Sequence, residues 1–189
     1  MGRKICCIHS RGENNLMIFT ETELKGAFII EIEKLEDERG FFARSWDSKE
    51  FKKRGMEPNL VQCNISFNNK KGILRGMHYQ KEPFEEIKLV RCTKGRIFDV
   101  IVDIRKDSLS KNKWFGIELT ESNHKMMYIP KGFAHGFQVL EDNSEVFYQM
   151  SQEFEPNYST GKRWNSSLFN ISWPIQPPIL SKQDTSWDE

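Results

Sequence analysis

Net charge, cysteine and long apolar runs are all scarce in this 189-residue sequence. The 28 basic and 27 acidic side chains leave a formal net charge of +1, whereas a dedicated nucleic-acid binder shows a strong basic excess. A phosphorylated small molecule remains a suitable ligand, because a few well-placed cations bind it. No apolar run approaches the ~20 residues that span a bilayer. We therefore expect neither a nucleic-acid partner nor a membrane partner.

The four cysteines do not form a recognisable metal or disulfide pattern. Cys6 and Cys7 are adjacent, and no C-x-x-C pair occurs, so a zinc knuckle is not expected. Cys63 and Cys92 lie in strand-like runs and are predicted to pack as small apolar groups. The N-terminus lacks the apolar core of a signal peptide, and Cys6 stands where a myristoylation pattern needs Ser or Thr. These features predict a cytoplasmic protein with free thiols.

The rest of the chain is dominated by short strand signals. Residues 1–16 are polar and aperiodic, which predicts a flexible N-terminal extension before one domain over residues 17–189. Short strands at regular spacing with Gly and Pro turns predict an all-β sandwich or barrel of the jelly-roll kind. The expected strands are 27–33, 41–46, 88–92, 96–104, 114–119, 125–130, 136–140 and 144–150.

One short helix is predicted over residues 47–54, where Asp47 can cap the helix and Phe51 can face inward. From Trp173 onward the chain carries Pro174, Pro177 and Pro178 and is expected to be extended. Gln62 and Asn64 alternate along a further strand, so both are expected to face the same side of it.

Two of the four histidines lie in motifs that suggest chemistry. His135 lies in I-P-K-G-F-A-H-G-F over residues 129–137, which has the P-x-G-x-x-H form of the second motif of cupin barrels. His78 lies in L-R-G-M-H-Y-Q over residues 74–80, where a metal-binding cupin has H-x-H. Gln80 replaces the second imidazole, and Lys88 is among the next polar positions expected inside the barrel. Gln is a poor ligand for transition metals, so no metal is expected.

Taken together, the motifs resemble the dTDP-4-dehydrorhamnose 3,5-epimerase family over about residues 17–187. The resemblance rests on the ordered segments 37–42, 62–66, 74–80, 88–91, 98–100, 129–137, 164–165 and 171–174. It implies a cupin fold, that is, a double-stranded β-helix or jelly-roll barrel with a few short helices. It also implies a homodimer, a nucleotide-sugar substrate and no cofactor. The implied reaction inverts C3, C5 or both of a nucleotide-linked 4-keto sugar through an enolate.

The resemblance assigns four residues to catalysis. His78 matches the general base, and an unperturbed imidazole pKa of ~6.5 suits that task. Tyr148 matches the acid on the opposite face, and a phenol with a pKa of ~10 is protonated at neutral pH. Asp184 matches the aspartate that orients the base, and Lys88 matches the cation that stabilises the enolate oxygen. Taken singly, each could instead be an ordinary structural side chain.

The resemblance assigns further residues to substrate binding. Arg39 matches an arginine that contacts the nucleotide, and Arg75 matches one that contacts the diphosphate or sugar. His135 matches a pocket histidine. Gln62 and Asn64 match the strand that faces the substrate, and Phe154 replaces a tyrosine that stacks on the nucleotide base.

Several positions depart from the usual pattern of the family, which has other residues at Arg44, Gln149, Phe154, Ser159, Ser166 and Ser167. These departures suggest that the reaction is retained while the nucleotide or sugar differs. Two other functions stay open on sequence grounds. One is a cupin that binds a sugar nucleotide without turnover, and the other is a metal-dependent cupin enzyme.

Overall fold

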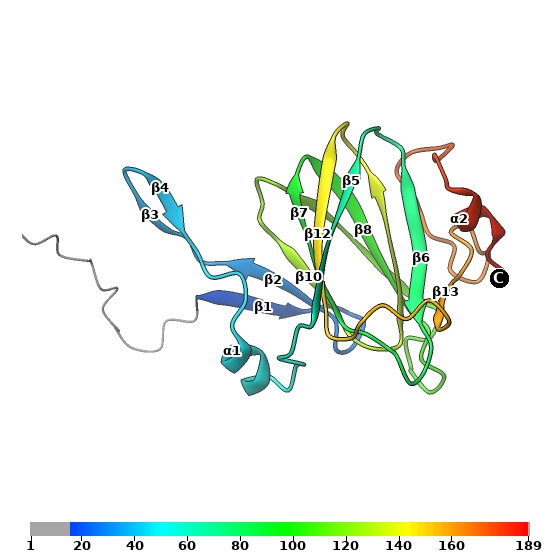
Figure 1. Ribbon diagram of the computed structural model, residues 1–189, viewed down its shortest axis with the longest axis horizontal. Coiled ribbons are helices and arrows are strands. Elements are labelled where there is room, and N and C mark those ends of the chain that lie inside the picture. The colour runs from blue at the N-terminus through cyan, green and yellow to red at the C-terminus, as the bar shows by residue number, and fades with distance from the viewer. Residues whose placement is uncertain (1–15, 189) are drawn as a thin grey trace, which may run out of the picture.

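The computed structural model describes residues 16–188, which fold into two facing antiparallel sheets and a small hairpin (Figure 1). The six-stranded sheet has the order β1-β2-β10-β7-β12-β5. Its strands are β1 (Met17–Glu21), β2 (Phe28–Ile32), β10 (Met126–Ile129), β7 (Lys88–Lys94), β12 (Ser144–Met150) and β5 (Gln62–Asn68). The five-stranded sheet has the order β13-β6-β11-β8-β9. Its strands are β13 (Ser159–Gly161), β6 (Leu74–Gln80), β11 (Phe133–Val139), β8 (Arg96–Asp103) and β9 (Trp114–Thr120).

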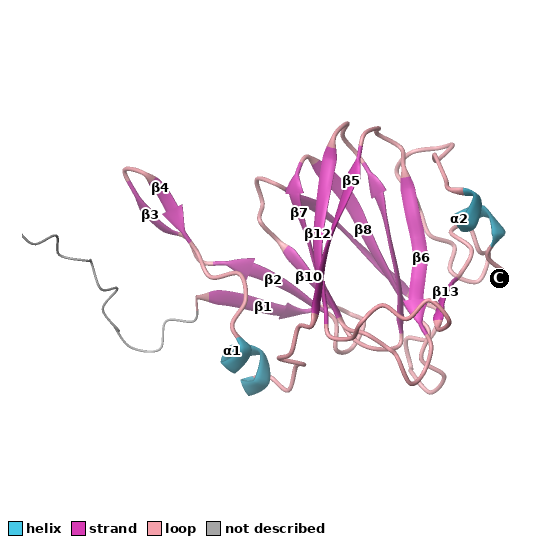
Figure 2. Cartoon of the chain, viewed as in Figure 1, coloured by secondary structure: helices cyan, strands magenta, loops and turns pink. Residues whose placement is uncertain are grey.

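Apart from the consecutive pairs β1-β2 and β8-β9, neighbouring strands in both sheets come from distant parts of the chain, as a jelly roll requires. In the six-stranded sheet β7 lies between β10 and β12, and in the five-stranded sheet β11 lies between β6 and β8. Figure 2 shows how little of the described chain is helical. The arrangement confirms the predicted all-β barrel of jelly-roll type.

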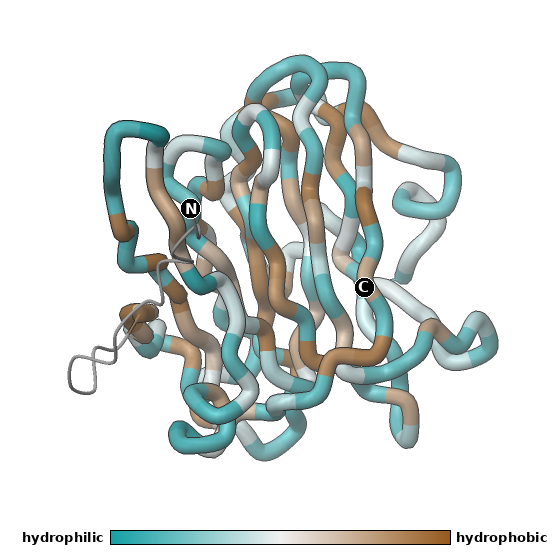
Figure 3. The backbone as a smooth tube through the Cα atoms, turned by 60° about the vertical axis from the view of Figure 1, so that its left-hand side comes forward, coloured by the Kyte–Doolittle hydropathy of each residue, from teal (hydrophilic) through white to brown (hydrophobic). Residues whose placement is uncertain are grey.

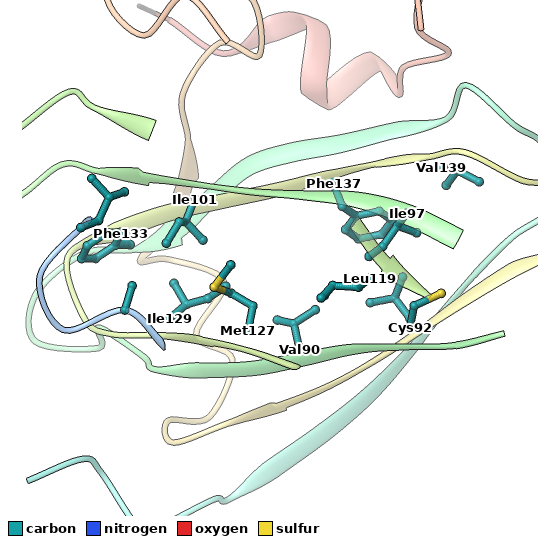
Figure 4. Close-up of a cluster of buried hydrophobic side chains, with 13 residues drawn as sticks. Val90, Cys92, Ile97, Ile101, Leu119, Met127, Ile129, Phe133, Phe137 and Val139 are labelled. Carbon is teal, nitrogen blue, oxygen red and sulfur yellow. The ribbon is translucent and has the colours of Figure 1, made fainter. Parts of the chain in front are cut away.

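The main core fills the space between the two sheets (Figure 4). Val90 of β7 and Met127 of β10 point from one sheet toward Ile101 of β8 and Phe137 of β11 in the other. Side chains alternate between the faces of a strand, so each strand sends every second residue into this layer. Figure 3 shows the same division along the backbone, with apolar segments in the strands and hydrophilic segments in the connecting loops.

The helix α1 (Ser48–Lys53) covers part of the outer face of the six-stranded sheet. Asp47 caps it by accepting hydrogen bonds from the backbone N–H groups of Lys49 and Glu50. Phe51, only 1% exposed, packs into a second apolar cluster with Ile30 and Met126. The predicted helix over residues 47–54, its cap and its buried phenylalanine are confirmed.

Three local predictions need correction. The predicted strand 41–46 is shorter, because β4 (Gly40–Phe42) pairs only with β3 (Leu35–Asp37) and the chain then turns into the cap of α1. The predicted extended tail contains a second helix, α2 (Lys182–Ser186), since Ser181 caps it by accepting from the Asp184 N–H. Cys63 lies exposed on the outer face of β5, whereas Cys92 is buried as predicted.

Burial raises the pKa of the Cys92 thiol to about 11. The predicted N-terminal extension lies outside the described residues except for Leu16. Within residues 16–188 no helix combines the length and apolar character needed to cross a membrane.

Asp103, at the end of β8, should give the fold a marked acid sensitivity. Burial alone would raise the pKa of its carboxyl, but hydrogen bonds from Arg105, Ser108 and Ser110 lower that pKa to about 2. A lowered pKa in the folded state stabilises the fold above pH ~4, and this contribution is lost as the pH falls toward 2. The shift corresponds to roughly 2 kcal/mol of the free energy of unfolding.

Urea unfolding of wild type and Asp103→Asn, followed by circular dichroism between pH 5 and 2, measures this contribution. We expect the variant to be less stable at pH 5 and to lose less stability on acidification. Parallel declines in the two proteins would contradict the assignment.

Candidate active site

A cavity of about 430 Å³ opens between the two sheets, and its lining is rich in polar side chains. β5 contributes Gln62, Asn64 and Ser66, which are half-buried, while the residues between them are exposed. This alternation confirms that Gln62 and Asn64 face the same side. β6 and β11 form the opposite wall.

His78 of β6 is held by a carboxylate from the far end of the chain. Its Nε2 lies 2.6 Å from Asp184 Oδ1, across 106 residues of sequence. A carboxylate can only accept, so Nε2 carries the hydrogen and the neutral ring keeps Nδ1 free to take a proton. In Figure 1, α2 lies beside β6, which is how the tail reaches the histidine.

Asp184 is fixed at both of its oxygens. Ser181 Oγ donates to Asp184 Oδ2 over 2.8 Å and accepts from the Asp184 N–H, which also caps α2. Burial would raise the pKa of Asp184, but the hydrogen bonds from His78 and Ser181, with the Gly76 N–H, hold it below its ordinary value. The carboxylate therefore stays ionised and oriented toward the imidazole.

His135 of β11 forms a second imidazole–carboxylate pair beside the first. It is the register partner of His78, and its Nε2 lies 2.7 Å from Oδ1 of the fully buried Asp99 of β8. Asp99 Oδ2 has no hydrogen-bond partner within the described part of the chain. The two strands approach closely at Gly76 and Gly136, where a Cβ on Gly76 would lie 2.6 Å from Gly136 Cα. Glycine here is what allows both histidines to share one wall.

Tyr148 lies on the opposite wall. It belongs to β12 of the six-stranded sheet, where Asn64 and Val90 are its register partners, and it lines the same cavity as His78. The pKa of Tyr148 is raised above its ordinary value, and burial is the largest cause. The negative charge of Glu86 also raises this pKa, whereas the positive charge of Arg75 lowers it. The phenol therefore stays protonated at neutral pH.

Lys88 of β7 is bound to an acidic side chain inside the cavity. Its ammonium lies 2.9 Å from Glu86 Oε1 and donates to the His78 carbonyl over 3.4 Å, with only 11% of the side chain exposed. Glu86 is itself buried and accepts from the Gln80 N–H through its other oxygen. The ion pair places the positive charge of Lys88 close to the strand that carries His78.

The expected binding residues within the cavity are held by specific partners. Arg75 donates from Nε to Asn68 Oδ1 over 2.7 Å, which directs an otherwise exposed side chain along the cavity wall. Gln62 Oε1 accepts from the Phe154 N–H over 2.9 Å and its amide donates to Asn64. These contacts bring the exposed Phe154 ring to the rim of the cavity.

Arg39 is not brought to this cavity by its own chain. It lies in the turn between β3 and β4, is 88% exposed at its side chain and forms an ion pair with Asp37. Figure 1 shows the hairpin projecting away from the barrel. The other predicted site residues, by contrast, are gathered in or directly behind the cavity lining.

Gln80, which stands where a metal-binding H-x-H motif has its second histidine, forms structural hydrogen bonds. Gln80 donates to the carbonyls of Phe84 and Glu153 and accepts from the Glu155 N–H, so its amide fixes the loops around the cavity. Among residues 16–188, no group of three or more His, Cys, Asp or Glu side chains is arranged to hold a metal ion.

The departures from the family pattern fall mostly outside the cavity. Phe154 and Ser159 line it, but Arg44 is paired with Asp47 at the cap of α1. Gln149 follows Tyr148 on β12 and therefore points to the other side of the sheet. A changed substrate preference stays a prediction, and it rests chiefly on Phe154 and Ser159.

Sequence reasoning missed several residues that support the site. Glu86, Asp99, Asn68 and Ser181 each bind a predicted site residue, and Gln183 lines the cavity directly. Ser181 was recognisable from its capping pattern, because Ser followed three residues later by an acid is a helix-start signal. The other partners depend on strand register, which the sequence does not display.

Comparison with known proteins gives a consistent family. The family model described as dTDP-4-dehydrorhamnose 3,5-epimerase matches residues 21–189. A curated relative of that name from Shigella flexneri is 44% identical over 165 residues, which cover 87% of this chain and 91% of the relative.

Solved structures agree. The dTDP-4-dehydrorhamnose 3,5-epimerase of Elizabethkingia anophelis superposes with a TM-score of 0.89 at 37% identity, covering 92% of this chain and 96% of that one. A dTDP-6-deoxy-D-glucose-3,5-epimerase from Legionella pneumophila, solved in complex with dTDP-4-keto-L-rhamnose, has a TM-score of 0.85 at 35% identity. The alignment covers 91% of this chain and 92% of that one.

Proposed function

The chain belongs to the dTDP-4-dehydrorhamnose 3,5-epimerase family, and from this membership we propose how its cavity performs the reaction. The protein is an isomerase that epimerises C3, C5 or both of a nucleotide-linked 4-keto sugar. In our proposal His78 is the base, Tyr148 the acid, Asp184 the residue that orients the base, and Lys88 the cation for the enolate oxygen.

The placement of His78 and Tyr148 on different sheets carries the proposal. His78 lies on β6 of the five-stranded sheet and Tyr148 on β12 of the six-stranded sheet, and both line one cavity of about 430 Å³. Inversion of a carbon requires removal of a proton from one face and delivery to the other. A sugar ring between the two walls would meet a proton acceptor on one side and a proton donor on the other.

The proton and electron changes balance without a redox step. His78 Nδ1 takes the proton from the carbon next to the C4 ketone, and the C–H electron pair moves to the ketone oxygen as an enolate. Lys88 stabilises the negative oxygen. The enolate collapses, the carbon takes the Tyr148 hydroxyl proton on the opposite face, and proton exchange with solvent restores imidazole and phenol.

Nucleotide binding is assigned to the rim of the cavity. Arg75, directed by Asn68, supplies a positive charge for the diphosphate or sugar, and the exposed Phe154 ring offers a stacking surface for the base. Gln62 and Asn64 supply amide groups, and His135 a ring nitrogen, toward the sugar hydroxyls. We also propose a cytoplasmic location, supported by the free thiols of Cys63 and Cys92.

We further propose that the protein is a homodimer and that Arg39 acts in the cavity of the second copy. The hairpin that carries Arg39 projects from its own barrel and exposes Phe41 and Phe42. The outer face of β5 exposes Ile65 and Phe67, which provide an apolar surface for a partner. A second copy that covers these side chains could present Arg39 to a nucleotide it cannot reach within one chain.

Proton abstraction and inversion can be separated by two substitutions. In deuterated water, with dTDP-4-keto-6-deoxyglucose as substrate, His78→Asn should lose both solvent exchange and inversion by at least about 100-fold. Tyr148→Phe should still exchange, because the base can return a deuteron to the same face, but it should not invert. NMR of the substrate measures both events.

The matched control for that experiment is Tyr158→Phe, whose half-buried ring packs on Phe84 outside the cavity lining. It should behave like wild type. Full exchange in His78→Asn, or inversion in Tyr148→Phe at the wild-type rate, would refute the assigned roles. Running the same assay with other nucleotides and 4-keto sugars tests the prediction of a changed substrate.

The negative charge of Glu86 should influence the pH at which the inversion rate falls in alkaline solution. Burial is the main cause that raises the pKa of Tyr148, and the Glu86 carboxylate adds to it, so the phenol keeps its proton above the usual pH. Removal of that negative charge in Glu86→Gln should move the alkaline fall of the inversion rate to lower pH. The control Glu85→Gln, at a neighbouring acid outside the cavity lining, should leave the fall in place. Identical profiles for wild type and Glu86→Gln would count against this coupling.

Subunit complementation tests Arg39. Arg39→Ala should raise KM about tenfold, as expected for loss of a charge-assisted hydrogen bond, with a smaller change in kcat. A hybrid dimer contains one Arg39→Ala subunit, which keeps His78, and one His78→Asn subunit, which keeps Arg39. The cavity with intact His78 then receives intact Arg39 from the partner subunit. Co-expressed, doubly tagged hybrids should therefore regain wild-type KM. A hybrid that retains the high KM would show that Arg39 acts within its own chain or not at all.

A further inference from the structure

The end of the chain contributes a second side chain to the surroundings of His78. After α2, Trp187 returns to β6, and its ring centroid lies 6.2 Å from the imidazole centroid at an interplanar angle of 71°. The indole lies against Gly161 of β13, the register partner of His78. A Cβ at position 161 would lie 2.6 Å from indole atoms Cε2 and Nε1, so glycine leaves the space that the indole fills.

A hydrogen bond to one nitrogen does not fix the plane of an imidazole. Asp184 holds Nε2, but the ring can still tilt about that contact, and a tilt would move Nδ1 relative to the substrate carbon. The edge-to-face contact with Trp187 restricts this movement from the side of the ring. The tail that supplies Asp184 thus also supplies a packing surface for the same ring.

The indole is held here by its shape, not by a hydrogen bond. Trp187 Nε1 is buried and has no partner within residues 16–188. A buried N–H without a partner is unfavourable, so the ring surface must account for the position of this side chain. The segment has other attachments, because Arg163 N–H donates to the Asp188 carbonyl and Ser181 caps α2.

We propose that Trp187 is a positioning residue that keeps the His78 ring in its reactive orientation, an inference that rests on the proposed function. It touches neither substrate nor reacting atoms and acts only through the imidazole. A small misplacement of a reacting group reduces the rate of the chemical step strongly while it leaves substrate binding to the rest of the cavity intact.

The test compares Trp187→Ala and Trp187→Phe by the rate of proton exchange at the sugar carbon in deuterated water. Trp187→Ala should lose about tenfold in kcat per mole of folded protein, with little change in KM. Trp187→Phe should retain most of the activity, because it keeps an aromatic ring and removes the unpaired N–H. If Trp187→Ala does not fold, Trp187→Leu, which keeps apolar volume without a planar ring, takes its place and should also lose kcat.

A double variant separates positioning from general stability. In the Asp184→Ala background the ring has already lost its anchor, so Trp187→Ala should add less than its full effect. The control is Trp46→Ala, which removes another indole, next to Phe51 on the outer face of the other sheet. Its N–H is also buried and has no hydrogen-bond partner in the described part of the chain. It should leave kcat per folded protein unchanged.

The outcomes distinguish the two levels of the proposal. Three results would overturn the role of Trp187: wild-type kcat in Trp187→Ala, a loss that Trp187→Phe does not restore, or full additivity with Asp184→Ala. Exchange by the wild-type protein in the same assay would still uphold the proposed function. Absence of exchange in wild-type protein with every 4-keto sugar offered would overturn both.

Discussion

The hydrogen bond between His78 and Asp184 joins residues 106 positions apart, and it anchors the imidazole of the candidate site. It requires β6 to lie between β13 and β11, and it requires the C-terminal segment to return along the five-stranded sheet. The return is fixed by backbone hydrogen bonds of Ile179 with Gly72 and Leu74. The orientation of one imidazole thus depends on the completed fold rather than on any local segment.

Several ionisable groups in and directly behind the cavity lining occur in pairs. Lys88 is bound to Glu86, His135 to Asp99 and His78 to Asp184. An isolated buried charge is strongly unfavourable, whereas a hydrogen-bonded partner offsets the loss of water and holds the side chain in one orientation. Tyr148, by contrast, has no ion-pair partner of this kind among the residues that the structure describes and is kept neutral. Burial favours its neutral form, which is the form that can donate a proton.

The sequence predicted the features that depend on local pattern. Alternation along β5 placed Gln62 and Asn64 on one face, and Asp47 marked the start of a helix that buries Phe51. Strand periodicity predicted the all-β class. The resemblance to the family predicted that Lys88, Tyr148 and His78 share one site, and the cavity lining contains all three side chains.

The features that the sequence did not predict depend on contacts between segments that are distant in the chain. Asp99 supports His135 only because β8 pairs with β11 in one register, and neither segment alone indicates it. Glu86 resembles the solvated acids around it until the fold buries it against Lys88. Arg39 shows the converse, since its motif predicts a binding role while the fold places it on a hairpin outside its own cavity.

The fold separates the residues to which we assign proton transfer from those to which we assign substrate recognition. His78 and Tyr148 stand on strands of the two facing sheets, where neighbouring strands fix their positions through register. Phe154 and Arg39 stand on a loop and on a projecting hairpin, and loops accept substitution without disturbing the core. The positions where this chain departs from the family pattern lie largely outside the barrel interior. Under this proposal, binding preference can change at the rim while the distance between the proposed base and the proposed acid, and hence the proposed chemistry, is preserved.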